Sequence, residues 1–204
     1  MRLSFDFLSF DFRAFGFLAL LLLASPAVGD VLTERDAQRA LFSEKGHSIR
    51  MAAELTELEQ KIVTGIIPLM AQQLRQPVRY YAAIAYSPDD GMVHDSIQAA
   101  MNYHTPEAAS RAAVAACNAM KSNGTQNCKV AAQVVPKRYK SRDLTLSIDA
   151  TVAFDRTYRK AKSPKAFAIS GKSGSWGIGQ TDDAARAGCE SSGGPGDCEI
   201  VIRD

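Results

Sequence analysis

The stretch AIAYS at residues 83–87 recurs in similar form as AFAIS at residues 166–170. Each copy is followed by a turn with glycine, a second strand-like stretch, a helical stretch that ends at a cysteine, and a last strand beside another cysteine. A unit too small to bury its own apolar face gains stability by packing against a copy of itself. The repeat therefore predicts two related units, each with the order strand, strand, helix, strand.

A threonine precedes the helical stretch of each unit. Thr105 stands before Pro106, and Thr181 stands before Asp182. Threonine is a favoured N-cap residue, and proline fits the first helical turn because its missing N–H would have no partner there. We expect a helix to begin at each of these sites. The many alanines of the first helix make it narrow, so its backbone can lie close to a sheet.

The first 29 residues have the pattern of a secretory signal. Arg2 and Arg13 are followed by an apolar run at residues 15–24, and the small residues Ala27 and Gly29 suit signal peptidase. The run is too short for a bilayer core, which needs about twenty residues. We expect cleavage after Gly29 and an exported protein, periplasmic or extracellular, with no transmembrane anchor after cleavage. An uncleaved N-terminal anchor is the alternative.

Four cysteines follow the signal, and they come in two pairs. An even number of cysteines in an oxidising compartment favours disulfides. Because the repeat places each pair at the same helix-to-strand loop, we expect Cys117 to bond with Cys128 and Cys189 with Cys198. The alternative is a four-cysteine zinc site, but intervals of 11 and 9 residues differ from the short paired spacings of zinc ligands.

The charge balance gives no general attraction to nucleic acid or to membranes. The whole chain has a formal net charge of +2, and the first 29 residues carry two basic and two acidic residues, so their removal leaves +2. A near-neutral protein has no strong long-range field. We therefore expect no specific nucleic-acid partner. The mature chain, residues 30–204, has the size of one domain.

The mature chain divides where the sequence pattern changes. Residues 30–78 read as a helical extension, residues 79–135 as the first unit, residues 136–164 as a connecting strand with its loops, and residues 165–204 as the second unit. Residues 79–204 together make one duplicated domain with two disulfides.

An apolar stripe with helical spacing runs along the extension. Its members are Met51, Leu55, Leu58 and Ile62. Pro68 cannot continue this helix without the loss of a hydrogen bond, so we expect it to start a new short helix. The stripe has two possible partners, the paired units or a coiled-coil helix of another chain. Its short length before Gly65 favours the paired units.

Residues 144–154 alternate between apolar and polar side chains. This alternation predicts a strand with one buried face. We therefore expect an α+β fold in which two pseudo-symmetric ββαβ units form one antiparallel sheet. Helices pack on one side of that sheet, and the helical N-terminal extension precedes it.

Three stretches of the first unit resemble a known family: YAAIAYSP at residues 81–88, NYHTPEAA at 102–109 and AAC at 115–117. The family is catalogued as domain of unknown function 4189 and occurs in exported bacterial proteins. The second unit is similar to it at residues 175–177, at Thr181 and at residues 184–189. The resemblance covers about residues 79–204 and implies secretion, cysteine pairing and duplication, but no enzymatic activity. The chain departs from the pattern by lacking a further cysteine soon after Cys128 and by inserting the stretch 144–154.

The sequence contains no complete catalytic or metal-binding pattern. His94, Asp95 and Ser96 are the residue types of a hydrolytic triad, but neighbours on a strand point to opposite faces, so another residue would have to complete the relay. His94 and His104 lack a third metal ligand. We expect no metal and no cofactor. The stretch GKSG at residues 171–174 lacks the upstream glycine of a phosphate loop and predicts a hairpin turn.

Two basic loops with tyrosines, at residues 137–142 and 156–162, are the best candidate contact surface. Arginine, lysine and tyrosine suit phosphate groups, anionic glycans and acidic proteins. A lone tryptophan is a further candidate, because exposed tryptophan is common at binding sites. The predicted binding residues are Lys137, Arg138, Tyr139, Lys140, Arg142, Tyr158, Arg159, Lys160 and Trp176.

These observations predict a non-enzymatic exported module that binds an unidentified protein or an anionic component of the cell envelope. An envelope hydrolase that uses His94 or His104 is one alternative. A structural protein that assembles through its N-terminal helix is the other.

Overall fold

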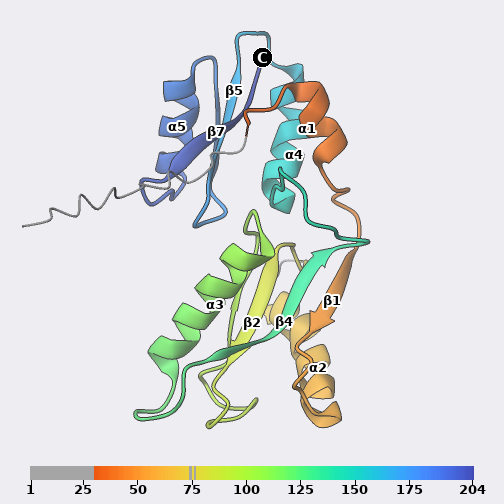
Figure 1. Ribbon diagram of the computed structural model, residues 1–204, viewed down its shortest axis with the longest axis vertical. Coiled ribbons are helices and arrows are strands. Elements are labelled where there is room, and N and C mark those ends of the chain that lie inside the picture. The colour runs from red at the N-terminus through yellow and green to blue at the C-terminus, as the bar shows by residue number, and fades with distance from the viewer. Residues whose placement is uncertain (1–29, 74, 76) are drawn as a thin grey trace, which may run out of the picture.

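The computed structural model describes residues 30–73, 75 and 77–204. The predicted signal, residues 1–29, lies outside the described residues. The described chain is α+β, with five α-helices and two antiparallel sheets of four and three strands. Each sheet belongs to one lobe of an elongated molecule (Figure 1). The α+β class is confirmed, whereas the prediction of one continuous sheet is wrong.

The first lobe contains the four-stranded sheet. Its strands lie in the order β1 (His47–Met51), β4 (Lys129–Pro136), β2 (Ala82–Tyr86) and β3 (Gln98–Ala100). Helix α3 (Pro106–Met120) and helix α2 (Glu57–Gln73) lie on opposite sides of this sheet (Figure 1).

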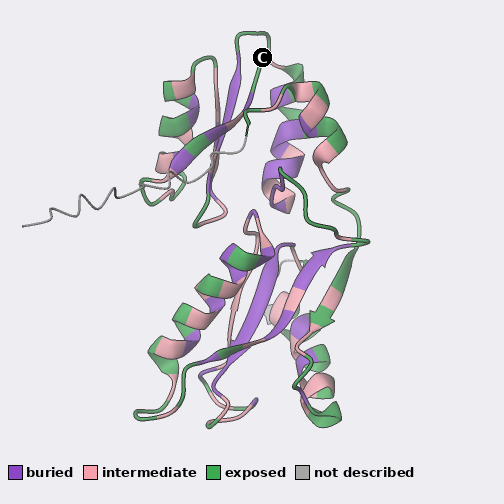
Figure 2. Cartoon of the chain, in the orientation of Figure 1, coloured by how far each residue is buried: buried purple, intermediate pink, exposed green. Residues whose placement is uncertain are grey.

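The central strand β2 is buried along its whole length (Figure 2). Successive side chains of a strand point to opposite faces. Ala83 and Ala85 accordingly pack with α3, whereas Ile84 and Tyr86 pack with α2. The small side chains therefore face one helix and the large side chains face the other.

The second lobe contains the three-stranded sheet in the order β6 (Trp176–Gly179), β5 (Ala166–Ser170) and β7 (Cys198–Arg203). As in the first lobe, the small side chains of the central strand face one helix and the large side chains face the opposite side. Ala166 and Ala168 of β5 pack with helix α5 (Asp182–Ser191).

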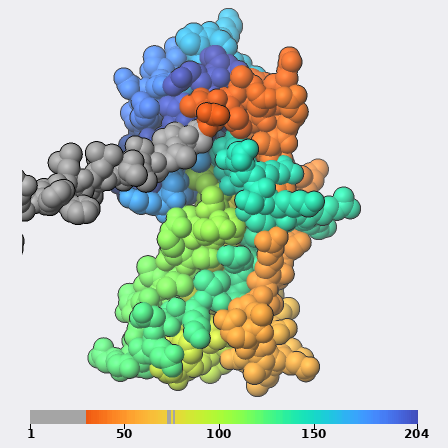
Figure 3. Space-filling model, in the orientation of Figure 1, coloured from red at the N-terminus to blue at the C-terminus, as the bar shows by residue number. Residues whose placement is uncertain are grey.

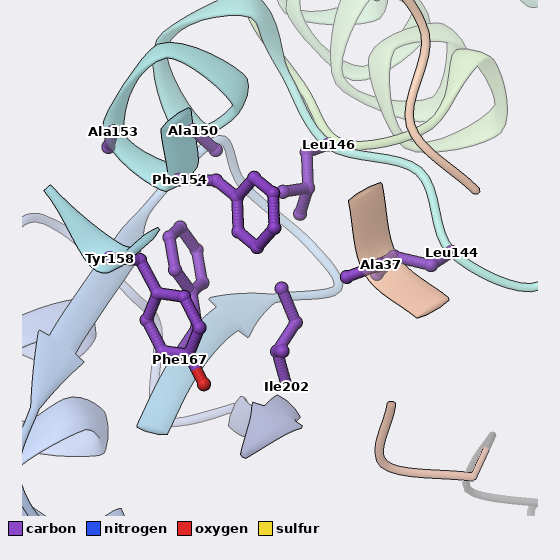
Figure 4. Close-up of a cluster of buried hydrophobic side chains, with 9 residues drawn as sticks. All are labelled: Ala37, Leu144, Leu146, Ala150, Ala153, Phe154, Tyr158, Phe167 and Ile202. Carbon is purple, nitrogen blue, oxygen red and sulfur yellow. The ribbon is translucent and has the colours of Figure 1, made fainter. Parts of the chain in front are cut away.

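The other face of this second sheet is covered by two helices, α1 (Glu34–Ala40) and α4 (Ile148–Arg156). Phe167 and Ile202 of the sheet meet Ala37 of α1 and Phe154 of α4 there (Figure 4). Tyr158 packs in the same cluster, in a short 3-10 helix, Tyr158–Lys160. This cluster is the main core of the second lobe.

The first lobe is inserted into the sequence of the second. All strands of the first sheet lie within residues 47–136, whereas the second lobe combines α1 with residues that follow position 143. Leu32 forms a parallel bridge with Ile202, and the side chain of Asp204 accepts a hydrogen bond of 3.0 Å from the amide of Glu34. Residues from both ends of the described chain therefore close the second lobe.

The order strand, strand, helix, strand occurs twice, as β2-β3-α3-β4 and as β5-β6-α5-β7. In each set the first strand pairs with the other two. The side chains of Thr105 and Thr181 accept hydrogen bonds from the amides three residues later, so both predicted N-caps are confirmed.

Both predicted disulfides are present. Cys117 bonds with Cys128, and Cys189 bonds with Cys198. Each bond joins the last turns of a helix to the start of the strand that follows or to the residue before it. A bond of this kind stabilises the fold mainly because it restricts the unfolded chain, and the effect is smaller for short loops.

The predicted strand at residues 144–154 is wrong, because residues 148–156 form α4. Ser147 is the N-cap and accepts a hydrogen bond of 3.2 Å from the amide of Ala150. Ala150, Ala153 and Phe154 are buried, at the i, i+3 and i+4 spacing of one helix face. The same apolar residues that alternate as in a strand therefore also include the spacing of one helix face.

The predicted helical extension is also partly wrong. Residues 47–51 form β1, and Pro68 lies inside α2 instead of starting a new helix. Pro68 removes the amide that would bond with the carbonyl of Thr64, but Thr64 is exposed, so water can replace that amide. Leu58, a member of the predicted apolar stripe, has an exposed fraction of 68%, so only part of that stripe is buried.

Glycines bring α5 into direct contact with its sheet. A Cβ atom at Gly177 would overlap with the carbonyl oxygen of Ala185 and the amide nitrogen of Cys189. A Cβ atom at Gly179 would likewise overlap with the backbone of Ala185. The backbone of α5 therefore lies against β6 with no room for side chains between them.

We predict opposite effects for two glycine substitutions. Gly177→Ala lowers the free energy of unfolding by roughly 2 to 3 kcal/mol, because α5 must move away from β6. Gly65→Ala raises it by about 1 kcal/mol, because a Cβ atom at Gly65 in α2 would meet no neighbour and alanine favours helix. Urea unfolding of both variants measures these changes, and equal effects would contradict the close packing of α5.

Candidate functional site

Six exposed basic side chains gather at one side of the junction between the lobes. We call this surface the cationic rim, and its members are Lys45, Arg50, Lys137, Arg138, Lys140 and Arg142. The pairing of β1 with β4 places His47 opposite Pro136, so the loop before β1 meets the loop after β4. The side chain of Lys137 lies against Gly46. Figure 3 shows the loop after β4, in teal, beside the orange segments around β1.

The basic side chains of the cationic rim form no ion pair with any residue of the described ranges. Two acidic residues, Glu44 and Asp143, lie on the same segments and are exposed. The basic residues outnumber them, so the surface keeps an excess of positive charge.

Two arginines of the rim are held in place by aromatic rings and carbonyl groups. The guanidinium of Arg50 lies 4.8 Å from the ring centre of Tyr139 and donates a hydrogen bond of 2.9 Å to the Tyr139 carbonyl. The guanidinium of Arg142 lies 3.7 Å from the ring centre of Phe42 and donates to the carbonyls of Ala40 and, at 3.1 Å, Leu41. Such contacts orient a guanidinium and leave other N–H groups for a ligand.

The aromatic rings that contact these two arginines belong to one cluster, which also includes Tyr81. The ring centre of Tyr139 lies 5.5 Å from that of Phe42 and 5.4 Å from that of Tyr81. The hydroxyl of Tyr80 donates a hydrogen bond of 3.0 Å to the carbonyl of Ser43. Burial raises the pKa of Tyr80 to about 12 and also raises the pKa of Tyr81 and of Tyr139. The phenols stay neutral and do not reduce the positive charge of the rim.

The second basic loop has a different role, because its central residues hold the lobe together. Tyr158 is buried, and its hydroxyl donates a hydrogen bond of 2.9 Å to the carboxylate of Asp204. Arg159 lies 3.6 Å from Glu34 and 3.3 Å from Asp155. Tyr158 is therefore not accessible to a partner, and the exposed side chain of Arg159 is already paired with two carboxylates. Lys160 is exposed, but it belongs to the short 3-10 helix of the second lobe, whose Tyr158 contacts the C-terminal residue Asp204.

The segment around His94 does not have the geometry of a hydrolytic triad. Asp90 lies near it, with 3.8 Å between the carboxylate and Nδ1 of His94. However, Nδ1 accepts a hydrogen bond of 3.1 Å from the amide of Ser96, so the ring proton is on Nε2, the wrong nitrogen for a triad. The hydroxyl of Ser96 is buried and makes no hydrogen bond within the described residues. A substrate could not reach it.

His104 joins the two lobes. The imidazole is 2% exposed, its Nδ1 accepts a hydrogen bond of 3.1 Å from the amide of Ser147, and its Nε2 donates one of 2.9 Å to the carbonyl of Ser175. Both nitrogens are therefore occupied. Burial lowers the pKa of His104 to about 4, so the ring is neutral at pH 7 and has a structural role.

The described ranges, 30–73, 75 and 77–204, contain no group of three or more histidine, cysteine, aspartate or glutamate side chains that could hold a metal ion. Within the same ranges, no helix is long and apolar enough to cross a membrane.

The structure also shows what sequence analysis missed. Lys45 and Arg50 belong to the rim, but they lie in the segment predicted as helix. The alternation of polar Ser48 and Arg50 with apolar Ile49 and Met51 is the sequence signal that could have indicated a strand there.

The chain matches no family model, no curated protein and no solved structure. The resemblance to the family of domain of unknown function 4189 therefore stays a prediction.

We predict different outcomes for two neighbouring tyrosines under the rim. Tyr80→Phe lowers the free energy of unfolding by about 1 kcal/mol, because the hydrogen bond to Ser43 is lost. Tyr81→Phe does not lower it, because the Tyr81 hydroxyl is buried without a hydrogen-bond partner among the described residues. Urea unfolding of both variants tests this difference, and a larger loss for Tyr81→Phe would contradict it.

We predict that acid weakens the fold through His104. The folded pKa of about 4 is below the unfolded value of about 6.5, so the unfolded chain binds more protons between these values. Stability is therefore lost as the pH falls from about 6.5 to 4, by about 3 kcal/mol at most from this residue. Urea unfolding at several pH values in this window measures the loss.

The His104→Gln variant is the test of that assignment. It has a smaller fall in stability over the same pH window, whatever its stability at pH 7. A double variant, His47→Gln with His94→Gln, keeps the full fall because it leaves His104 as the only histidine of the chain. An equal pH dependence in wild type and His104→Gln would show that other groups cause the effect.

Proposed function

We propose that the protein is a non-enzymatic exported module that binds an anionic macromolecule of the cell envelope through the cationic rim. The observation that carries this proposal is the set of six exposed basic side chains that form no ion pair within residues 30–73, 75 and 77–204; aromatic rings fix two of them. A basic side chain that is not engaged in an ion pair keeps its charge available to a partner.

The chemistry of the rim favours phosphate or carboxylate groups. Guanidinium groups bind such anions through two parallel hydrogen bonds, and lysines add charge without a fixed geometry. One exposed ion pair contributes little, but several in one interface add attraction that weakens with salt. We therefore expect binding that depends strongly on ionic strength.

Other features support export and duplication. Disulfides form and persist in oxidising compartments, and the chain has two. Export with a cleaved signal remains part of the proposal. The two ββαβ sets share their element order, their strand pairing and the position of the disulfide. These shared features support an origin of the two units by duplication.

Charge reversal at two places tests the proposed surface. The rim variant combines Lys137→Glu, Arg138→Glu and Lys140→Glu. The control variant combines Arg156→Glu, Lys160→Glu and Lys162→Glu, which changes the net charge equally at exposed residues of the other basic loop. Oxidised mature protein and both variants are immobilised, and anionic components of envelope extracts are captured at low and high salt.

We predict that wild type and control capture the same component and that the rim variant binds it at least tenfold more weakly, which corresponds to about 1.4 kcal/mol. High salt weakens binding of wild type as well. Similar losses for both variants would show an effect of net charge alone and would contradict a defined site. Equal thermal midpoints of the three proteins confirm that the fold is unchanged.

A further inference from the structure

A shallow groove lies between the lobes, apart from the cationic rim. The first lobe contributes Met101, Asn102 and Tyr103, and the second lobe contributes Ser175, Trp176 and Ser192. Its volume is about 390 Å³, within the range of small-molecule sites. Figure 3 shows the two lobes in contact about midway along the long axis of the molecule. Sites for small molecules occur preferentially at such junctions.

None of the residues that line the groove is charged. An ionised ligand would lose water there without gaining a partner of opposite charge. The lining instead combines two aromatic residues, Tyr103 and Trp176, with hydroxyl groups. Aromatic residues of this kind offer an apolar ring face and a polar N–H or O–H group.

The polar groups of the groove can both donate and accept hydrogen bonds. Within the described residues, neither the Tyr103 hydroxyl nor the Trp176 indole N–H has a hydrogen-bond partner, so both can donate to a ligand. The hydroxyl of Ser175 donates to the carbonyl of Ser192 at 3.0 Å, and the hydroxyl of Ser192 lies within hydrogen-bond distance of the carbonyls of Cys189 (2.9 Å) and Trp176 (3.0 Å). Both hydroxyl oxygens can still accept. A ligand with several hydroxyl groups matches this set.

The walls of the groove are fixed before any ligand binds. The side-chain amide of Asn102 donates a hydrogen bond of 2.9 Å to the carboxylate of Asp149 and accepts one of 3.3 Å from the backbone N–H of Asp149. A Cβ atom at Gly174 would overlap with the carbonyl of Asn102, so the two walls touch there. The indole of Trp176 stacks on the buried ring of Phe167, with 5.9 Å between ring centres. A site formed in advance loses less entropy on binding.

We propose that this groove binds a neutral saccharide, one or two sugar units long. A sugar ring has an apolar face of C–H groups for an aromatic ring and hydroxyl groups that donate and accept, and it carries no charge. The proposal does not depend on the cationic rim, because the two surfaces share no residue.

Trp176 is the only tryptophan of the chain, so its fluorescence reports on the groove directly. Oxidised mature protein is titrated with N-acetylglucosamine, its β-1,4-linked disaccharide and glucose, and with glucuronate as a charged sugar of similar size. We predict a saturable change of emission with at least one neutral sugar and at least tenfold weaker binding of glucuronate. The rim variant with Lys137→Glu, Arg138→Glu and Lys140→Glu gives the same titration as wild type.

Two variants test the place of binding by calorimetry. Trp176→Phe removes the indole N–H, and Met101→Arg puts a charge at the edge of the groove while Met101 itself is only half-buried. Each lowers the affinity for the neutral sugar at least tenfold, and Val93→Arg, at an exposed site outside the groove, leaves it unchanged. Thermal midpoints show that each variant folds.

A comparison of the monosaccharide with insoluble chitin, a neutral polymer, tests whether the natural ligand is a free sugar or part of a glycan chain. Binding of both indicates a glycan chain, and binding of the monosaccharide alone indicates a free sugar. The proposal is overturned if no neutral sugar gives saturable binding up to tens of millimolar. Equal binding of glucuronate, or full affinity in both Trp176→Phe and Met101→Arg, overturns it as well.

Discussion

Small side chains on one face of each central strand set the distance between the sheets and the helices α3 and α5. Ala83 and Ala85 in the first lobe, and Ala166 and Ala168 in the second, leave space for a helix whose own contact residues are also small. Dense packing then requires larger side chains on the opposite face, and Ile84 and Phe167 provide them. Each sheet thus has helices on both sides, so neither sheet has a free face on which the other could stack.

The two lobes therefore meet through their ends, in a junction made mostly of polar contacts. His104 forms hydrogen bonds with Ser147 and Ser175. The carboxylate of Asp149 accepts a hydrogen bond from Asn102 and forms an ion pair with Arg79. The carbonyl of Tyr80 accepts a further bond of 3.3 Å from the amide of Ile148. Both surfaces to which we assign binding lie beside this junction. Their residues come from both lobes or from the segments that connect them, so the junction holds each surface in one arrangement.

Sequence reasoning succeeded where the information was local. The cysteine pairs, the threonine caps and the order of elements in each unit depend on neighbours in the chain, and the structure contains them. It failed at residues 148–156, because a stretch with alanine at both odd and even positions satisfies a strand and a helix alike. It could not fully separate Arg138 from Arg159, because one of the two carboxylates that pair with Arg159 belongs to Glu34, more than a hundred residues away. Lys45 and Arg50 join the rim only through the pairing of β1 with β4, which no local pattern shows.

The bridge between Leu32 and Ile202 affects the order in which the chain can fold. Synthesis from the N-terminus delivers residue 32 long before residue 202, so α1 has no β7 to pack against until the end of the chain has been made. The first lobe, within residues 47–136, is contiguous and can form earlier. During that interval the apolar side of α1 stays uncovered. Exposed apolar segments of this kind aggregate easily and are bound by chaperones. Completion of the second lobe is thus a late event, and a truncated chain without β7 would expose the surface of α1 permanently.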